Sequence, residues 1–194
     1  MRITREIGID MGHRVTNHGS KCRNLHGHRY RIVVTLEGGL FTEGASEGMV
    51  LDFGFVKNLM MDHIDLYFDH GMALWVKDPL LAHELGPTFQ SIRENCAMYG
   101  FVALKDGWRW GKLVVTQDVP TAENLAKLWA YILKPYMERD MEGTDGRLHS
   151  VTVWETPNCS ATYVLPVGGV GMFMDVDWAK FENRTAADLA DDRV

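Results

Sequence analysis

Residues 21–30, KCRNLHGHRY, contain a thiol, Cys22, four positions before two imidazoles, His26 and His28, which a single glycine separates. The pattern that follows predicts a strand over residues 29–36, and side chains two positions apart on a strand point to the same face. His26 and His28 therefore converge, as a divalent metal requires of a His-x-His pair. They share the covered face of the predicted strand with four apolar residues, Tyr30, Ile32, Val34 and Leu36.

A third imidazole, His13, follows the run Ile3–Ile9, which we expect to be the antiparallel neighbour of that strand. In this arrangement His13 meets His26 and His28, and three histidines with a vacant fourth position are a common plan for catalytic zinc. The alternative is a hydrogen-bonded His-x-His pair in a half-buried strand. The third histidine and the nearby thiol favour the metal site.

Basic residues gather around this stretch. No carboxylate occurs between Met11 and Arg31, although the whole chain carries a formal net charge of -6. Such a basic island on an acidic protein indicates an anionic ligand, and a solvated basic face is the alternative. The cations are Arg14, Lys21, Arg23, Arg29 and Arg31.

Length and composition predict one globular domain over residues 1–194, since 46% of the residues are hydrophobic and can form a sizeable core. No apolar run reaches the length of a membrane span, and residues 1–10 lack the apolar segment of a signal peptide. Three scattered cysteines fit reduced thiols, so we expect a cytoplasmic protein. The acidic balance argues against nucleic-acid binding. We therefore expect neither a nucleic acid nor a membrane as partner.

The order of the elements predicts an α+β fold. Strands are expected at residues 2–10, 29–36, 148–156 and 161–167, forming a four-stranded antiparallel sheet. Two long helices are expected on one face of this sheet. The first begins at the N-cap Asp52 and ends near residue 69, and the second runs from Thr121 to Tyr136.

The long stretch between the two helices predicts an insertion of about residues 72–116. It reads as two short helical pieces at 79–86 and 88–99, a turn at 105–107 and a strand at 113–116. We expect this insertion to be a peripheral cap or an interface piece. A C-terminal extension occupies residues 168–194.

Two further sets of ionisable residues are candidates for a functional site. Glu155 has the parity of the apolar residues Val151 and Val153, and an acid on an apolar face is costly unless it is paired. An exposed position at a frayed strand end is the alternative. Asp69 directly precedes His70, which is a weak signal by itself because a surface dipeptide explains it equally well.

Five motifs, taken together and in order, resemble the 6-pyruvoyltetrahydropterin synthase and 6-carboxytetrahydropterin synthase (QueD-type) family. The resemblance covers residues 3–167 apart from the insertion. Its C-x-x-x-HGH spacing resembles the carboxytetrahydropterin synthase branch, which feeds queuosine and other 7-deazapurines. The insertion and the C-terminal extension depart from compact members, and Phe68 stands where the family has leucine. The motifs are His13, Cys22-x-x-x-His26-Gly27-His28, Asp69-His70, PTAEN at 120–124 and Glu155-Thr156.

The resemblance implies the tunnelling fold (T-fold), in which subunits join their sheets into a barrel, usually as a homohexamer built from two trimers. It implies a zinc-dependent lyase that converts 7,8-dihydroneopterin triphosphate to 6-carboxy-5,6,7,8-tetrahydropterin, acetaldehyde and triphosphate. Zn²⁺ would be held by His13, His26 and His28. In the family, the Asp-His pair reaches the site from a neighbouring subunit, so active sites would lie at subunit interfaces.

The resemblance also implies a role for each remaining residue. Cys22 would act as a thiolate base, favoured by zinc and by the adjacent cations Lys21 and Arg23. A second proton would be handled by His70, which Asp69 orients. The pterin's amino-pyrimidine N–H pair would be held by Glu155 in a charge-assisted, two-point contact. The substrate-binding candidates are Glu155, Thr121, Lys21 and Arg23.

Other functions remain open at this point. The chain can be a 6-pyruvoyltetrahydropterin synthase or another T-fold enzyme that acts on a pterin or a purine. It can also be a non-catalytic module in which Cys22 joins the three histidines in a closed structural zinc site. A structural module has no need of Asp69-His70, PTAEN and Glu155.

Overall fold

The computed structural model describes residues 1–108, 111–142 and 144–167. These residues form two compact units. The first contains residues 1–9 and 29–66 and the described residues from 122 onward, and the second contains residues 10–28 and 67–121. The sequence did not predict this division. A single domain stays a prediction, and the expected C-terminal extension at 168–194 lies outside the described residues.

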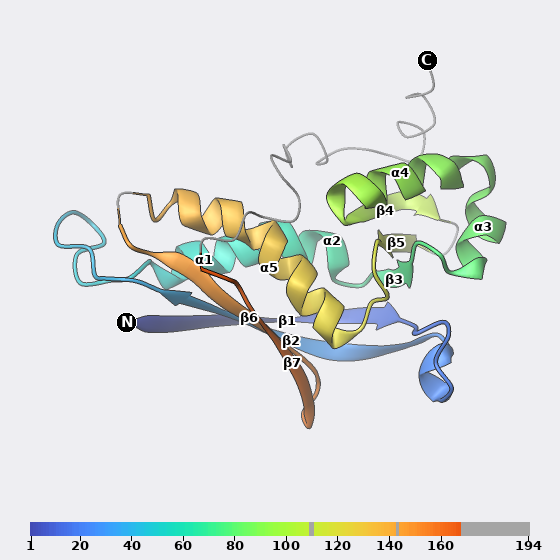
Figure 1. The fold of residues 1–194 in the computed structure, drawn as a ribbon, viewed down its shortest axis with the longest axis horizontal. Coiled ribbons are helices and arrows are strands. Elements are labelled where there is room, and N and C mark those ends of the chain that lie inside the picture. The colour runs from blue at the N-terminus through green and yellow to red at the C-terminus, as the bar shows by residue number, and fades with distance from the viewer. Residues whose placement is uncertain (109–110, 143, 168–194) are drawn as a thin grey trace, which may run out of the picture. The chain divides into compact units, whose positions relative to one another are not determined.

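Within the described residues, seven strands pair in the order β4-β5-β3-β1-β2-β6-β7 (Figure 1). The pairs β2/β6, β6/β7 and β4/β5 are antiparallel, whereas β3 runs parallel to both β1 and β5. The four expected strands correspond to β1, β2, β6 and β7. The predicted four-stranded antiparallel sheet is therefore too small, and the sheet is mixed. The strands are β1 (Arg2–His13), β2 (His26–Glu37), β3 (Met72–Trp75), β4 (Phe101–Trp108), β5 (Gly111–Thr116), β6 (Arg147–Thr156) and β7 (Cys159–Val164).

In the first unit, strands alternate between covered and exposed side chains, as the sequence predicts. Tyr30 and Ile32 on β2 are fully buried, whereas Arg31 between them is exposed. Ile32 pairs with Val153 of β6, which is also fully buried. A shift of one residue would turn these apolar side chains to solvent, so the burial of one face fixes the register.

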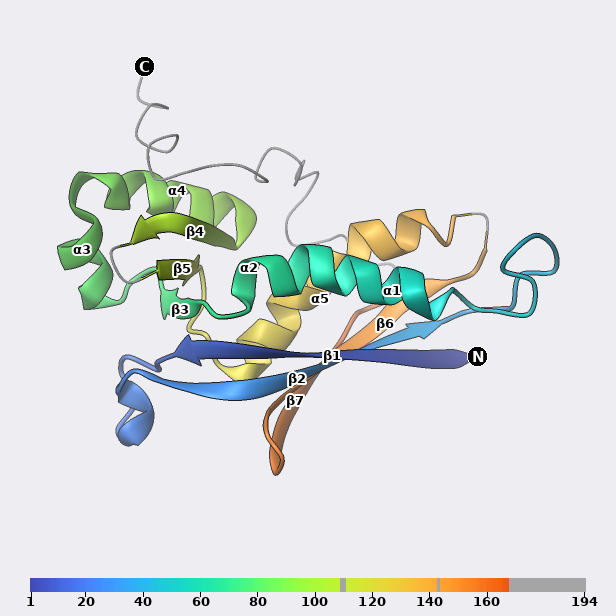
Figure 2. The ribbon, with the colours of Figure 1, turned by 180° about the vertical axis from the view of Figure 1, so that it is seen from behind.

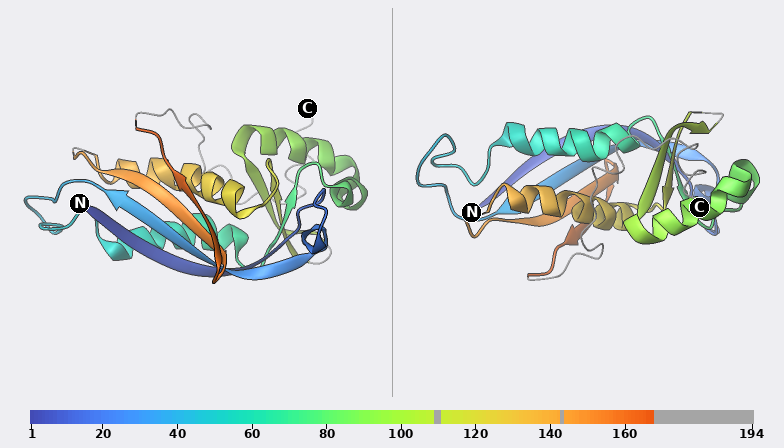
Figure 3. Two further views of the ribbon diagram at one scale, coloured as in Figure 1. Left: turned by 60° about the horizontal axis from the view of Figure 1, so that its bottom comes forward. Right: turned by 90° about the horizontal axis from the view of Figure 1, so that it is seen from above.

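Two helical segments cover that apolar face of the first unit (Figures 1 and 3). The first begins at the predicted N-cap Asp52, whose Oδ1 accepts the N–H of Phe55 at 2.9 Å, and comprises α1 (Phe53–Met60) and a π-helical turn (Met61–Asp65). The short helix α2 (Leu66–Phe68) continues it into the second unit. The second segment is α5 (Ala122–Arg139). Its fully buried Trp129 meets the ring of Tyr30 edge-on, with 6.5 Å between centroids. Both predicted helices are thus present, the first interrupted by the π turn.

The second unit contains the predicted insertion (Figure 2), and the buried residues of the insertion form a small core of their own. The two short helices are confirmed as α3 (Pro79–Leu85) and α4 (Phe89–Tyr99), joined by a 3-10 turn (Gly86–Thr88). The predicted strand is the end of β5. The predicted turn at 105–107 is wrong, because these residues belong to β4. The buried core residues include Leu74, Leu81, Ile92, Cys96, Leu104 and Leu113.

The insertion extends the sheet at β1. Gly12 pairs with Met72 and His13 pairs with Ala73 in a parallel ladder. A peripheral cap is therefore wrong, because β3 adjoins the residue that was predicted to bind metal. A role of the insertion in an interface stays a prediction. No helix in the described part of the chain is long and apolar enough to cross a membrane.

Candidate metal centre

Three imidazoles meet in the second unit, where β1 ends and β2 begins. The ring centroids of His13 and His26 lie 4.5 Å apart, and those of His13 and His28 lie 5.2 Å apart. The His26 and His28 centroids are separated by 5.0 Å. One ring nitrogen of each histidine lies within 4.8 Å of the others, so the three can bind one metal ion. Among the described residues, this is the group whose ligand atoms converge in that way.

Gly27 allows the two strands to approach closely at this point. A Cβ atom built on Gly27 would lie 3.0 Å from the carbonyl oxygen of Met11 and 3.4 Å from the Cα of Gly12. Any side chain between His26 and His28 would therefore push β1 away from β2. The glycine keeps His13 within reach of the other two imidazoles.

Backbone carbonyls orient two of the three rings. The Nδ1 of His13 lies 2.7 Å from the carbonyl oxygen of Pro120, and the Nδ1 of His26 lies 2.8 Å from that of Asn24. A carbonyl oxygen only accepts hydrogen bonds, so each Nδ1 carries the proton and donates it. In the neutral ring the lone pair is then on Nε2, which is the atom available to a metal. Such outer contacts fix the tautomer and the direction of a metal-binding histidine.

Cys22 lies close to the histidines in sequence but outside their group of ligand atoms. It occupies a half-buried position in the 3-10 turn Lys21–Arg23. The Val15 N–H donates to its carbonyl oxygen at 2.9 Å, and its own N–H donates to the Ser20 hydroxyl at 3.4 Å. The ligand atoms that converge among the described residues are the three imidazole nitrogens, without the Cys22 sulfur.

The basic island is partly neutralised by carboxylates from elsewhere in the sequence. Arg14 donates from Nε to Asp78 at 2.7 Å, and Arg31 lies 3.6 Å from Glu6. Two of the five cations in the island thus face carboxylates, which weakens the prediction of an anionic ligand. Lys21 and Arg23, the two that flank Cys22, are both exposed.

Asp69 and His70 form the predicted pair. The Asp69 carboxylate accepts from His70 Nδ1 at 2.6 Å, and its other oxygen accepts the N–H of Asp10 at 2.8 Å. Burial raises the pKa of Asp69, but the Asp10 N–H, the His70 ring and the Lys112 ammonium outweigh burial and hold that pKa below its usual range. The carboxylate therefore remains ionised and fixes the His70 ring.

The backbone of His70 adopts a left-handed conformation, with φ of 54°. Its N–H donates to the Asp10 carbonyl at 2.7 Å, and the Lys112 ammonium donates to the neighbouring Asp69 carbonyl at 2.6 Å. Non-glycine residues held in this region are often found at functional sites. The His70 side chain is 76% exposed, and the structure does not place it in the group of three imidazoles.

Glu155 is half-buried on β6 in the first unit, so it is not the exposed end of a frayed strand. The Tyr30 hydroxyl donates to its Oε1 at 3.4 Å. Burial, followed by the negative charge of Glu155 and the hydrogen bond to it, raises the pKa of Tyr30 far above its usual value. Tyr30 therefore stays protonated and acts as a donor to the carboxylate.

Thr121 is half-buried in the turn that precedes α5, and its N–H donates to the Val119 carbonyl at 2.7 Å. This turn presents the Pro120 carbonyl to His13. Sequence reasoning treated Pro120 as a turn former and missed this contact, although the PTAEN motif marked the place. Nothing in the sequence indicated that the Asn24 carbonyl contacts His26, except that Asn24 lies between Cys22 and His26.

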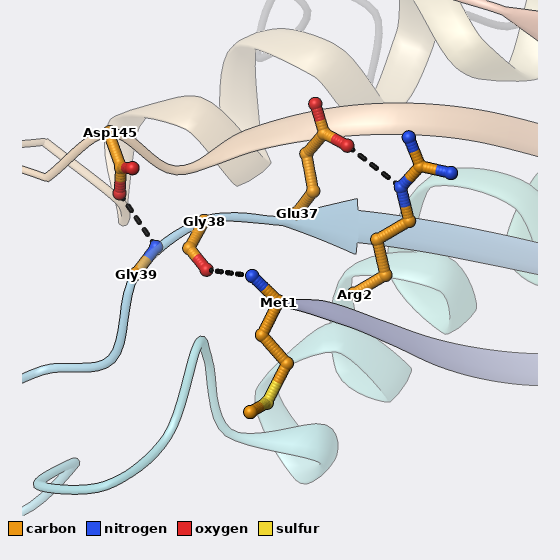
Figure 4. Close-up of a pocket in the computed structure, with 6 residues that line it drawn as sticks. All are labelled: Met1, Arg2, Glu37, Gly38, Gly39 and Asp145. Carbon is orange, nitrogen blue, oxygen red and sulfur yellow. Dashed lines mark hydrogen bonds and ion pairs between the residues drawn. The ribbon is translucent and has the colours of Figure 1, made fainter.

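A surface pocket in the first unit contains none of the predicted site residues (Figure 4). The Arg2 guanidinium donates to Glu37 at 2.8 Å, and the Asp145 carboxylate accepts the Gly39 N–H at 2.7 Å. Arg2, with Arg147 and His149, lowers the pKa of Glu37 below its usual value. These polar groups satisfy one another, so we assign the pocket no function. Its lining is Met1, Arg2, Glu37, Gly38, Gly39 and Asp145.

Comparison with known sequences gives one consistent result. A sequence model of the family described as 6-pyruvoyl tetrahydropterin synthase matches residues 2–165. A Rickettsia felis protein named 6-carboxy-5,6,7,8-tetrahydropterin synthase is 30% identical over 159 residues, which cover 82% of this chain and 96% of the relative. An Aquifex aeolicus protein of the same name is 30% identical over 144 residues, covering 74% of this chain and 76% of the relative.

Solved structures resemble this fold at low sequence identity. An uncharacterized protein of Wolinella succinogenes superposes with a TM-score of 0.63 at 24% identity, covering 84% of this chain and 97% of the other. A 6-pyruvoyltetrahydropterin synthase variant of Plasmodium vivax gives a TM-score of 0.54 at 15% identity, with coverages of 84% and 96%. At these identities the likeness concerns the fold alone.

Proposed function

Since the chain belongs to the 6-pyruvoyl tetrahydropterin synthase family, we propose that it is a 6-carboxy-5,6,7,8-tetrahydropterin synthase. The observation that carries this proposal is the group of His13, His26 and His28, oriented so that it can hold one metal ion. The relatives that carry this name align over most of the chain. The C-x-x-x-HGH spacing resembles the same branch of the family.

Zinc is the metal that we propose for this group. Three neutral imidazoles with a vacant fourth position suit zinc, and the two carbonyl contacts favour the neutral ring. When bound, the ion would supply Lewis-acid polarisation to oxygen atoms of the substrate. The nitrogen lone pairs of the three imidazoles would be donated to this ion and could not accept a proton. Proton transfer would therefore come from other side chains.

The proposed substrate is 7,8-dihydroneopterin triphosphate, and the proposed products are 6-carboxy-5,6,7,8-tetrahydropterin, acetaldehyde and triphosphate. Cys22 would remove a proton as the thiolate, with Lys21 and Arg23 beside it to favour the negative charge. Because Asp69 accepts from Nδ1 of His70, Nε2 of that exposed ring would exchange a second proton.

Substrate binding is proposed for a second set of residues. The Glu155 carboxylate would accept two N–H groups of the pterin, and the Tyr30 hydroxyl would hold that carboxylate in place. Lys21 and Arg23 would contact the triphosphate, and Thr121 would line the site beside the Pro120 turn. The product would enter 7-deazapurine synthesis.

We further propose the T-fold assembly, a homohexamer of two trimers with sites at subunit interfaces. β4 and β7 end the hydrogen-bonded order of the described strands, and sheet edges of this kind need to be paired or covered. The exposure of His70 supports a role in the site of a neighbouring subunit.

Two alternative functions, a 6-pyruvoyltetrahydropterin synthase and a structural zinc module, can be distinguished from the proposed one by a single experiment. The family description favours a 6-pyruvoyltetrahydropterin synthase as the second candidate. A structural zinc module is disfavoured because the Cys22 sulfur lies outside the group of ligand atoms. Incubating the metal-loaded protein with 7,8-dihydroneopterin triphosphate and identifying the products by mass separates them. A 6-carboxy product supports the proposal, a 6-pyruvoyl product supports the second candidate, and no turnover contradicts both.

A further inference from the structure

A buried carboxylate, Asp78, joins the insertion to the loop that contains Cys22. Its side chain has no exposed surface, whereas Asp is almost never fully buried unless it is paired. Its Oδ1 accepts the Leu80 N–H at 3.0 Å and caps α3. Its Oδ2 accepts from Arg14 Nε at 2.7 Å and from the Thr16 hydroxyl. A buried charge is costly without such partners, so these contacts hold the loop firmly against α3.

The two residues that Asp78 binds lie on either side of Val15. The Val15 N–H donates to the carbonyl of Cys22 at 2.9 Å, and the Val15 carbonyl accepts the His18 N–H at 3.0 Å. Fixing Arg14 and Thr16 therefore fixes the backbone of Val15, which in turn holds the backbone of Cys22. A continuous set of contacts leads from the insertion to the backbone of Cys22.

We propose that Asp78 is a positioning residue for the Cys22 thiol. This inference rests on the proposed function, in which Cys22 transfers a proton. Cys22 lies in a single 3-10 turn, and the flanking side chains of Lys21 and Arg23 are exposed and provide little packing. General-base catalysis requires the base within hydrogen-bond reach of its proton, so a loop that moved freely would lose it. The insertion thus supplies part of the active-site framework.

The substitution Asp78→Asn separates this role from helix capping. Asn is as good an N-cap as Asp, so the contact to Leu80 is kept. The amide removes the negative charge that Arg14 and Thr16 share and replaces an accepting oxygen by a donor. A matched control is Asp52→Asn, because Asp52 caps α1 through Phe55 and neither Arg14 nor Thr16 binds it in the structure.

The experiment follows the loop and the thiol directly, in protein carrying Cys159→Ser. Cys96 is buried, so Cys22 is then the accessible thiol. Hydrogen exchange over residues 14–24 and the rate of Cys22 alkylation by iodoacetamide are compared between Asp78→Asn, Asp52→Asn and the parent. We expect faster exchange and faster alkylation in Asp78→Asn alone, with its metal content retained. In turnover, kcat should fall by about tenfold or more while KM changes little.

Several outcomes would overturn the inference. Unchanged exchange and alkylation in folded Asp78→Asn would mean that Asp78 does not position the loop. Loss of metal from that variant would place its effect on His13, through the adjacent Arg14. If Asp78→Asn does not fold, Thr16→Val removes one contact and should give a smaller change in the same direction, and no change would reject the proposal. Exchange and alkylation need no turnover, so failure of the parent to convert 7,8-dihydroneopterin triphosphate would count against the proposed function instead.

Discussion

The Nδ1 of His13 donates a hydrogen bond to the carbonyl oxygen of Pro120 across 2.7 Å, although the two residues are 107 positions apart. The contact joins the end of β1 to the turn that precedes α5. It links the first residue of the PTAEN motif to the candidate metal centre, because the carbonyl sets which nitrogen of His13 would face a bound ion.

Pro120→Gly should weaken metal binding. The substitution keeps the carbonyl but removes the fixed φ that presents it, so the acceptor is placed less accurately. We expect the zinc affinity, measured by competition with a chelator, to fall by about tenfold, the lower end of the effect of outer contacts at metal sites. Pro157→Gly, in the exposed turn between β6 and β7, is the matched control and should change nothing. His26→Ala, which removes a ligand, shows how much zinc affinity can be lost. If Pro120→Gly binds zinc as tightly as the parent, this carbonyl does not orient His13.

Asp69→Asn should impair catalysis without loss of metal. An amide cannot accept from His70 Nδ1 with the same strength and can favour the wrong tautomer, so we expect kcat to fall by about two orders of magnitude. The chain provides a comparable pair in His83 and Glu84, which are adjacent and lie 3.2 Å apart, with His83 exposed and the Glu84 side chain largely covered. Glu84→Gln should leave kcat unchanged. Equal activity of Asp69→Asn and Glu84→Gln would show that the Asp69-His70 pair is only a surface contact.

The sequence predicted the imidazole group because it depends on strand periodicity. His26 and His28 have the parity of buried Tyr30 and Ile32, and a neighbouring strand brings His13 beside them. The N-cap Asp52 and helix α5 were also readable, since a capping side chain and a recurring apolar face are local signals.

The contacts that orient these groups could not be predicted in the same way. Pro120 and Asn24 act through backbone carbonyls, which every residue possesses. Strand β3 has only four residues, Met72–Trp75, and a short apolar run does not distinguish a strand from a helix. The residues at 105–107 read as a turn but lie within β4, at the point where its register with β5 shifts between Leu104 and Trp108. Asp78 resembles an ordinary helix cap, and its partner Arg14 is 64 positions away.

Tyr30→Phe should weaken pterin binding rather than slow the chemical step. The change removes the donor that holds Glu155 at 3.4 Å and leaves the buried ring in place. A hydrogen bond to a charged group of this length should be worth up to about tenfold in affinity. Fluorescence titration with a non-reactive pterin measures it. Tyr163→Phe, which breaks the part-buried hydroxyl contact with Tyr131 at 2.7 Å, serves as control and should bind as the parent does.

A shared site predicts complementation between inactive variants. Cys22→Ala and His70→Ala should each have little activity, because each removes one proton-transfer group. Unfolding the two proteins together and refolding them should restore part of the activity, since some interfaces then receive His70 from one subunit and Cys22 from another. Mixing the folded proteins briefly is the control. If co-refolded variants remain as inactive as the separate ones, both groups must come from the same subunit.

Zinc content and turnover, measured on one preparation of Cys22→Ala, test the central claim most directly. The claim is that the three imidazoles hold the metal and that the thiol stands beside it as a base. It predicts that zinc remains at about one per chain, with pterin binding retained, while turnover of 7,8-dihydroneopterin triphosphate falls by about two or more orders of magnitude. Loss of zinc together with activity would contradict the claim, because Cys22 would then be a fourth ligand in a closed structural site.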